Sequence, residues 1–416
     1  MFRLARVAKR PHGVEAMDTQ RFTIKERVLS VDDPLLQDAL AQVHNTPERP
    51  RCLCVAGGIE MYVSRLRHFV VKRMPETGHR HHPGCPSDEP DPALSGLGEL
   101  VGDAVRESDV GAIELSVDFP WTRSPGHGGS RSGVDLPGDV EVARHRISLR
   151  GLIHFLFERA GFNRWTPAME GKRNQGVLHK YLTAAAHEVI AKGIPLAERL
   201  YVPEPFNEST HPAVAQRRRL KLDILRPVEG RSPLAIVLGE FKAVESTSSG
   251  HRVWIRHMPD APLLVDGKTW KRIEKVFAPL FEASDADTGC RVHLVMAALI
   301  RARREHTYEI DAASLVLTNE HWIPLEGVHE LPLVQSLIEQ RRRFVKPLRY
   351  DAQGAARFPN ALLLDVGATP VPLHVFSPFM TARDREIKEA ALRACDHAWV
   401  WPEDASVMPT LPPARP

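Results

Sequence analysis

The chain has 416 residues, of which 43% are hydrophobic and 26% are charged. This is the composition of an ordinary globular protein, and its length predicts two or three domains. The formal net charge is only +3, so a nucleic-acid partner would have to be recognised by local basic patches. No apolar stretch is long enough to span a membrane, and five cysteines give no even disulfide framework, so we expect a cytoplasmic protein.

The first chemical pattern is a group of thiols and imidazoles near the N-terminus. A C-x-C pair places two thiols on the same side of a short strand, and a third cysteine follows a histidine-rich segment, residues 79–82. Thiolates and imidazoles bind tetrahedral Zn²⁺, and a complete set of four leaves no open position for catalysis. The predicted ligands of a structural Zn²⁺ ion are Cys52, Cys54, His81 and Cys85. His79 and His82 are alternatives to His81, and buried thiols beside a solvated loop are the other interpretation.

The segment between these cysteines alternates apolar and basic residues. Over residues 60–75 this alternation predicts a β-hairpin with one buried face and one basic face. The basic face is either a phosphate-contacting surface or an ordinary solvated one.

The second chemical pattern is an acidic residue followed by acid-x-Lys. Residues 234–238 form an apolar run typical of a central strand, and this run leads into Glu240 and Lys242. A neighbouring strand over residues 219–226 would place Asp223 opposite them. Two carboxylates can hold Mg²⁺, which polarises a phosphate and activates water, while a lysine stabilises the transition state. The alternative is an ordinary buried strand that ends in a surface ion pair.

The elements around this pattern follow the order α-β-β-β-α-β. The predicted elements are a helix over 177–191, strands over 196–202, 219–226 and 234–242, a helix capped by Asp266, and a strand over 291–300. This order resembles the PD-(D/E)xK nuclease superfamily, whose core is restriction-endonuclease-like. The resemblance implies that Asp223, Glu240 and Lys242 are catalytic, with Asp223 and Glu240 as magnesium ligands. It also suggests Glu188 as a further catalytic carboxylate from the first helix, although a solvated helix glutamate is the other interpretation.

Basic residues cluster at 216–221, 300–304 and 340–349. The first cluster adjoins Asp223 in sequence, so its cations would flank the metal and contact a phosphate backbone. The candidate DNA-binding residues are Arg217, Arg218, Arg219, Lys172 and Arg173. Each of them could also be an ordinary solvated charge.

Several runs, among them RWTPAMEGKR, LYVPEPF, GEFKAVE and HWIPLEG, resemble an uncharacterised bacterial family carried on plasmids and integrative conjugative elements. We predict an α+β multidomain protein with a zinc-binding β module (1–120), a linker (121–145), a nuclease-like core (146–300) and a β-rich C-terminal extension (301–416). The expected function is a Mg²⁺-dependent DNA endonuclease or nickase of a mobile element. The alternative is a non-catalytic, zinc-containing DNA-binding or scaffold protein that maintains such an element with partner proteins.

Overall fold

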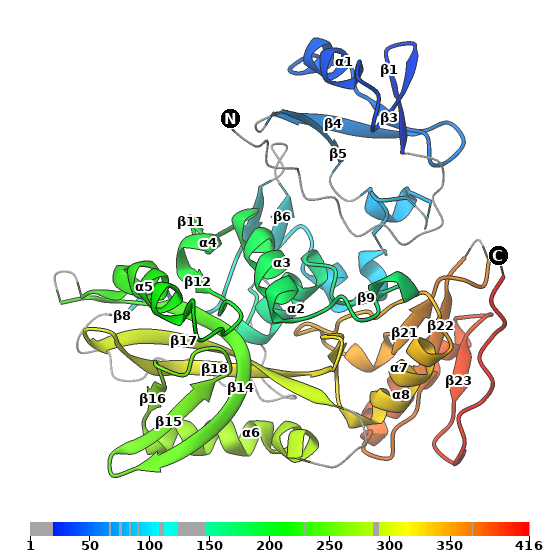
Figure 1. Cartoon of the computed structure of the whole chain (residues 1–416). Coiled ribbons are helices and arrows are strands. Elements are labelled where there is room, and N and C mark those ends of the chain that lie inside the picture. Colours follow the sequence, from blue (N-terminus) through cyan, green and yellow to red (C-terminus); the bar gives the residue numbers. More distant parts are fainter. Residues whose placement is uncertain are drawn as a thin grey trace.

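The computed structural model of the chain describes residues 20–65, 68–74, 77–82, 85–89, 91–107, 112–123, 146–227, 230–285, 291–367 and 369–415. These residues form a mixed α+β structure with eight α-helices and several sheets (Figure 1). Most of the predicted linker, residues 124–145, lies outside the described residues. No helix in the described ranges combines the length and the apolar character that crossing a membrane requires.

The N-terminal module is a small antiparallel sheet with one helix packed against it. Its elements are β1 (Arg21–Ile24), β2 (Arg27–Ser30), α1 (Leu36–Val43), β3 (Arg51–Cys52), β4 (Ile59–Arg65) and β5 (Phe69–Arg73). The strand order is β2-β1-β3-β4-β5, and a separate hydrophobic cluster that includes Phe22, Leu40 and Met61 supports it. The β-hairpin predicted over residues 60–75 is confirmed, because β4 and β5 pair in antiparallel fashion.

A second sheet joins residues from before and after the linker. It consists of β6 (Val105–Glu107), β7 (Ile113–Leu115), β10 (Val189–Ala191) and β11 (Ile194–Pro195), in the order β11-β10-β7-β6. β7 and β10 run parallel, and the buried residues of β7 belong to the same hydrophobic cluster as those of the central helices. The chain before residue 120 therefore contributes to the central fold as well as to the N-terminal module.

The central fold is built on long strands that close into a small barrel. Its strands are β14 (Ala235–Thr247), β15 (Gly250–Ile255), β16 (Leu263–Val265), β17 (Val292–Arg304) and β18 (Thr307–Asn319). They are hydrogen-bonded in the order β14-β15-β16-β18-β17, and β17 pairs back with β14. β12 (Leu200–Tyr201) adds to β14 in parallel, and β19 (Pro324–Leu325) adds to β18. The strands predicted over 234–242 and 291–300 are confirmed as parts of β14 and β17.

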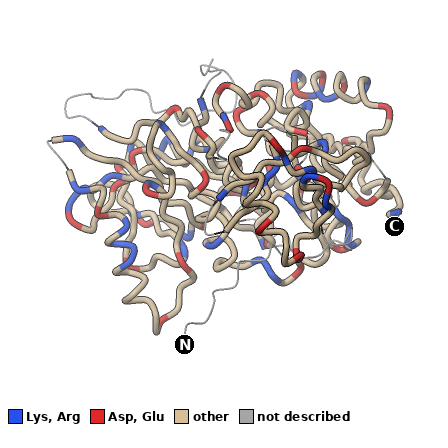
Figure 2. Tube along the Cα trace, turned by 90° about the horizontal axis from the view of Figure 1, so that it is seen from above, with Lys and Arg blue, Asp and Glu red and all other residues tan. Residues whose placement is uncertain are grey.

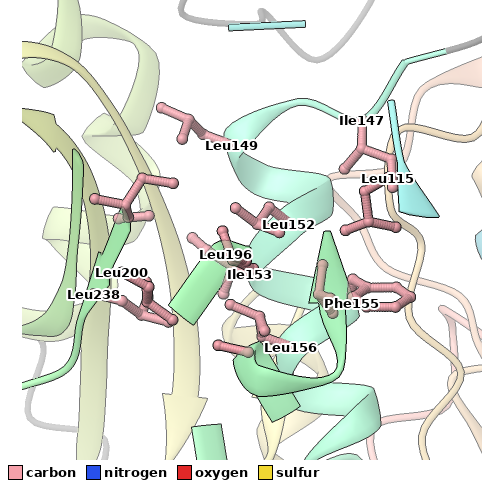
Figure 3. Packing of buried hydrophobic residues seen from close by; sticks show 14 of the residues in the cluster. Leu115, Ile147, Leu149, Leu152, Ile153, Phe155, Leu156, Leu196, Leu200 and Leu238 are labelled. Carbon is pink, nitrogen blue, oxygen red and sulfur yellow. The ribbon is translucent and has the colours of Figure 1, made fainter. Parts of the chain in front are cut away.

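Helices cover both faces of these strands, with α2 (Leu149–Arg159) and α3 (Gln175–His187) above them in Figure 1 and α6 (Gly267–Asp285) below. Side chains alternate along β14, so Leu238 packs in the cluster of α2 and α3 while Val237 packs in the cluster of α6. Figure 3 shows the first cluster, where Leu200 and Leu238 approach the apolar residues of α2. The predicted cap of α6 is confirmed, because Asp266 accepts hydrogen bonds from the first backbone N–H groups.

The strand predicted over residues 219–226 is wrong. Residues 211–222 form helix α5 (His211–Leu222), and Asp223 begins the short 3₁₀ helix η5 (Asp223–Leu225). Val214, Arg218 and Leu222 are buried at helical spacing, a pattern hidden by the apolar–polar alternation of its last residues. Because a helix stands where the second of the three strands was expected, the α-β-β-β-α-β order is not present in the elements predicted for it.

The C-terminal part combines a second mixed sheet with two helices. Its elements are α7 (Leu331–Glu339), β20 (Phe344–Val345), β21 (Ala361–Leu363), β22 (Val371–Val375), α8 (Ala382–Arg393) and β23 (Trp399–Trp401). The sheet order is β23-β22-β21-β20-β9, and β9 (Arg164–Trp165) comes from the chain after α2. The shortest remaining elements are α4 (Leu196–Arg199), β8 (Thr122–Arg123) and β13 (Ser232–Pro233).

Candidate functional site

Four metal-ligating side chains converge in the N-terminal module. Cys52 ends β3, Cys54 lies in the turn that follows, and His81 and Cys85 come from the segment after β5. The Cys52 and Cys85 Sγ atoms are 3.7 Å apart, and His81 Nδ1 lies 3.3 Å from Cys54 Sγ and 3.6 Å from Cys85 Sγ. All four ligand atoms lie within 4.8 Å of one another. The predicted histidine is therefore the one that joins the cluster, whereas His79 and His82 are exposed.

These distances match the edges of a zinc tetrahedron. Zn–S bonds of about 2.3 Å and a Zn–N bond of about 2.0–2.1 Å place two sulfur ligands about 3.8 Å apart and a sulfur and a nitrogen about 3.6 Å apart. A disulfide would instead require sulfurs at about 2.0 Å. The cluster could thus hold a metal ion such as zinc, and its four ligands complete the shell of a structural site.

The surroundings of the thiols lower the pKa of Cys52 but raise those of Cys54, mainly through burial, and of Cys85. Gln20 Nε2 lies 3.7 Å from the Sγ atoms of both Cys52 and Cys85, and the Ser87 N–H donates to Cys85 Sγ at 3.4 Å. The hydrogen bond from Cys85 lowers the pKa of Cys52 to about 5, and the same contact raises the pKa of Cys85. Ionisation of Cys52 therefore opposes ionisation of Cys85, and a divalent cation would offset this opposition.

An acidic pair directly after Cys85 links the metal centre to the central fold. Glu89 pairs with Arg73 of β5 and, at 3.4 Å, with Arg159 of α2. Asp88 lies 3.8 Å from Arg164 of β9. The sequence analysis did not single out Asp88 and Glu89, although both lie close in sequence to the predicted zinc ligand Cys85.

Glu240 lies in β14 as predicted, but its carboxylate already has partners. It is 5% exposed, accepts a hydrogen bond from His293 Nδ1 at 3.0 Å, and lies 2.8 Å from Arg256 Nε. Burial raises the pKa of Glu240, but the hydrogen bond and charge of His293 and the charge of Arg256 outweigh it and hold the pKa below its ordinary range. Trp322 stacks on His293 with ring centroids 4.0 Å apart. Glu240 is therefore an ionised carboxylate fixed by protein groups.

Lys242 does not stand beside Glu240 in a regular strand. A β-bulge between Phe241 and Ala243 interrupts the pairing of β14 with β15 at Lys242, and the Lys242 side chain is exposed. In a regular strand Glu240 and Lys242 would share one face, but this alternation does not apply across a bulge.

Asp223 is remote from Glu240, which corrects the predicted magnesium site. It lies at the end of α5, is half-exposed, and pairs with Arg226 at 2.6 Å. It lines a hollow together with Ala302, whereas Glu240 pairs with Val295 on the same strand, β17. The seven residue steps from 295 to 302 span roughly 20 Å of extended chain. The two carboxylates therefore cannot share one ion.

Glu188 is a surface residue at the end of α3. Its carboxylate lies 3.2 Å from Arg159 Nη2. It thus takes part in the ion pairs near the N-terminal module, which agrees with the alternative interpretation of a solvated helix glutamate. Within the described ranges, the Cys52, Cys54, His81 and Cys85 cluster is the one group of three or more potential metal ligands that lie together.

The candidate DNA-binding residues have different environments. Arg218 is buried and pairs with Asp260, and Arg217 pairs with Glu204 at 2.6 Å. Arg219 and Lys172 are exposed.

Arg173 is a structural residue rather than a DNA contact. Its guanidinium donates to the backbone carbonyls of Gly161, Phe162 and His321, at 3.0 to 3.1 Å. Burial lowers the pKa of Arg173 to about 9. The interpretation of Arg173 as a DNA contact missed these acceptors, because they are separated from Arg173 in the sequence.

Residues of the second basic cluster, together with residues 222–227 that directly follow the first cluster, line one hollow of about 320 Å³. We call it the basic hollow; its lining residues are Leu222, Asp223, Arg226, Pro227, Ala302, Arg303, Arg304, Glu305, His306 and Tyr308. The third cluster is structural, because Arg342 pairs with Asp365 and Lys346 with Glu330 inside the C-terminal part. Elsewhere acidic and basic residues are interspersed along the chain, as Figure 2 shows.

Replacing a zinc ligand tests the metal centre. We expect purified protein to contain about one zinc per chain. Cys85→Ser should lower the zinc content and the thermal unfolding temperature of the N-terminal module, because metal binding contributes to its folding. Cys395→Ser, a change in a free cysteine outside the cluster, is the matched control and should alter neither quantity. Full zinc content in Cys85→Ser would contradict the assignment.

Neutralising the acidic pair tests the link between the module and the central fold. Each partly exposed ion pair contributes up to about 1 kcal/mol. The double change Asp88→Asn and Glu89→Gln should therefore increase hydrogen exchange and protease cleavage near β5 and β9 while zinc content stays constant. Glu48→Gln with Glu60→Gln is the control, because these residues pair with Lys25 and Arg51 inside the module. Unchanged exchange in the first variant would show that the ion pairs do not hold the two parts together.

Comparison with known proteins gives a family but no activity. The chain shows no significant similarity to a curated protein or to a solved structure. One family model, described as a protein of unknown function (DUF1173), matches residues 22–404. This match includes the metal centre, the barrel strands and most of the C-terminal sheet. The chain therefore belongs to the DUF1173 family of proteins of unknown function.

Proposed function

We propose that this protein is a non-catalytic, zinc-containing DNA-binding protein, and that it serves a mobile genetic element. The observation that carries the proposal is the meeting of two basic segments, α5–η5 and the β17–β18 turn, around the basic hollow. Clustered guanidinium groups beside a concave surface are suited to a phosphate backbone. Zinc would have a structural role in the N-terminal module.

Only part of this basic surface is available to phosphates. Arg217, Arg218 and Arg301 are each paired with a carboxylate from the protein. Arg219, Arg303 and Arg304 have no carboxylate partner within the described part of the chain. These three arginines are the proposed phosphate contacts. Arg219 lies on α5, and Arg303 and Arg304 lie at the end of β17.

Removing two of these cations tests DNA binding. Arg303→Ala with Arg304→Ala should weaken binding to DNA at least tenfold at low salt and should reduce the salt dependence by about two charges, because each contact releases one counterion. Fluorescence anisotropy across a salt series measures both quantities. Arg383→Ala with Arg393→Ala on α8 makes the same change of charge far from the basic hollow and is the control. Equal losses of DNA affinity in the two double variants would show that DNA binding depends on the net charge of the protein and not on the basic hollow.

A metal-dependent nuclease is the second candidate, and Glu240 is the observation that favours it. An ionised, buried carboxylate in a bulged central strand is a feature of many catalytic sites. Two observations argue against a nuclease. Glu240 is already paired with His293 and Arg256, and Glu240 lies far from Asp223.

A cleavage assay separates the two candidates. We expect no cutting of single-stranded, double-stranded or nicked DNA with Mg²⁺ or Mn²⁺. If cutting occurs, Glu240→Gln should abolish it through loss of the carboxylate charge, whereas the remote Asp223→Asn should leave the rate unchanged. Cutting with that pattern would replace the first proposal by the second. Cutting that survives Glu240→Gln would indicate a contaminating nuclease.

A further inference from the structure

The basic hollow has apolar walls and a charged rim. Leu222, Pro227, Ala302 and Tyr308 supply the apolar and aromatic lining, from η5 and its neighbours on one side and from β17 and β18 on the other. Three arginines supply positive charge, against the two carboxylates of Asp223 and Glu305. Phosphate binding alone does not require an apolar recess between the cations.

The backbone at the rim is irregular in two places. The pairing of β17 with β18 shifts between Ala302 and Arg304, which leaves Arg303 as the extra residue of a β-bulge. His306, in the turn that follows, has a φ of 53°, a left-handed conformation that is uncommon for residues other than glycine. Bulges redirect side chains and are frequent beside functional sites. The turn thus places Arg303 and His306 differently from residues of a regular hairpin.

Arg226, which lines the basic hollow, is paired with two carboxylates. Its Nε lies 2.6 Å from Asp223 Oδ1, and its Nη2 lies 3.5 Å from Glu305 Oε1. The Arg226 side chain remains 65% exposed despite these contacts, so a ligand can reach its guanidinium. Arginine guanidinium planes are one of the surfaces on which unpaired bases stack.

Size and chemistry together favour one nucleotide as the occupant. A volume of about 320 Å³ is within the range of small-ligand sites, roughly 300–1,000 Å³. A duplex keeps its bases stacked and paired, so only an unpaired base could enter such a recess. We propose that the basic hollow takes up one unpaired base of single-stranded DNA, with the adjoining phosphates on Arg303 and Arg304. This inference rests on the proposed DNA-binding function and adds a preference for single strands to it.

The test compares DNA probes on the full-length, zinc-loaded protein. Fluorescence anisotropy is measured with a single-stranded oligonucleotide, with the duplex of the same sequence, and with a single strand that carries abasic sites. Removing a stacked base typically weakens binding by about tenfold. We therefore expect the intact single strand to bind about tenfold more tightly than the other two probes.

A substitution then assigns this preference to the basic hollow. Ala302→Phe fills the recess without changing charge, so the variant should bind all three probes with similar affinity. Ala391→Phe on α8 adds the same side chain elsewhere and should keep the wild-type preference. The thermal unfolding temperature of each variant shows whether it is folded, and the abasic probe tests base uptake without any variant.

Each outcome has a distinct meaning. Equal binding of all three probes by the wild-type protein would overturn base uptake while leaving the proposed DNA binding intact. A single-strand preference that persists in folded Ala302→Phe would place the base elsewhere and overturn the assignment to the basic hollow. No binding of any probe by the wild-type protein would overturn both this inference and the proposed function.

Discussion

The architecture depends on the burial of β14 on both faces. This strand pairs with β12, β15 and β17, and it therefore joins the barrel to the sheet edge that α3 and α4 cover. Ile236 and Leu238 face one hydrophobic cluster, while Ala235 and Val237 face the other. Because apolar burial is the largest favourable contribution to folding, a polar residue in this stretch would disturb both layers at once. The first charged residue, Glu240, comes where β14 begins to leave the core.

Several buried charges in this protein are paired with an opposite charge, and this limits which residues can meet a ligand. Glu240 is held by His293 and Arg256, Lys346 by Glu330, and Arg218 by Asp260. An unpaired charge in such surroundings would be strongly destabilising, so each pair is an integral part of the fold. The guanidinium groups that remain for an external anion are exposed ones, and this supports the proposed binding at the surface.

The parts of the structure that short-range patterns determine could be predicted from the sequence. The spacing of Cys52, Cys54, His81 and Cys85 predicted the metal cluster, and apolar runs predicted β14 and β17. Asp223 was misplaced because the residues before it alternate like a strand while also repeating at helical spacing, and only packing decides between the two. The pairing of Glu240 with His293 and the basic hollow could not be predicted, because both bring together residues that are far apart in the sequence. Pairings of that kind follow from the tertiary fold and leave no local signal.

The closeness of Cys85 to Asp88 and Glu89 has a thermodynamic consequence. The same short segment supplies a metal ligand and the carboxylates that contact Arg159 and Arg164. If metal binding orders this segment for docking, then docking must raise the affinity for the metal by the same factor, because coupling free energies are reciprocal. A partner that binds the central fold and competes for Arg159 or Arg164 would thereby weaken zinc binding at a site it never touches.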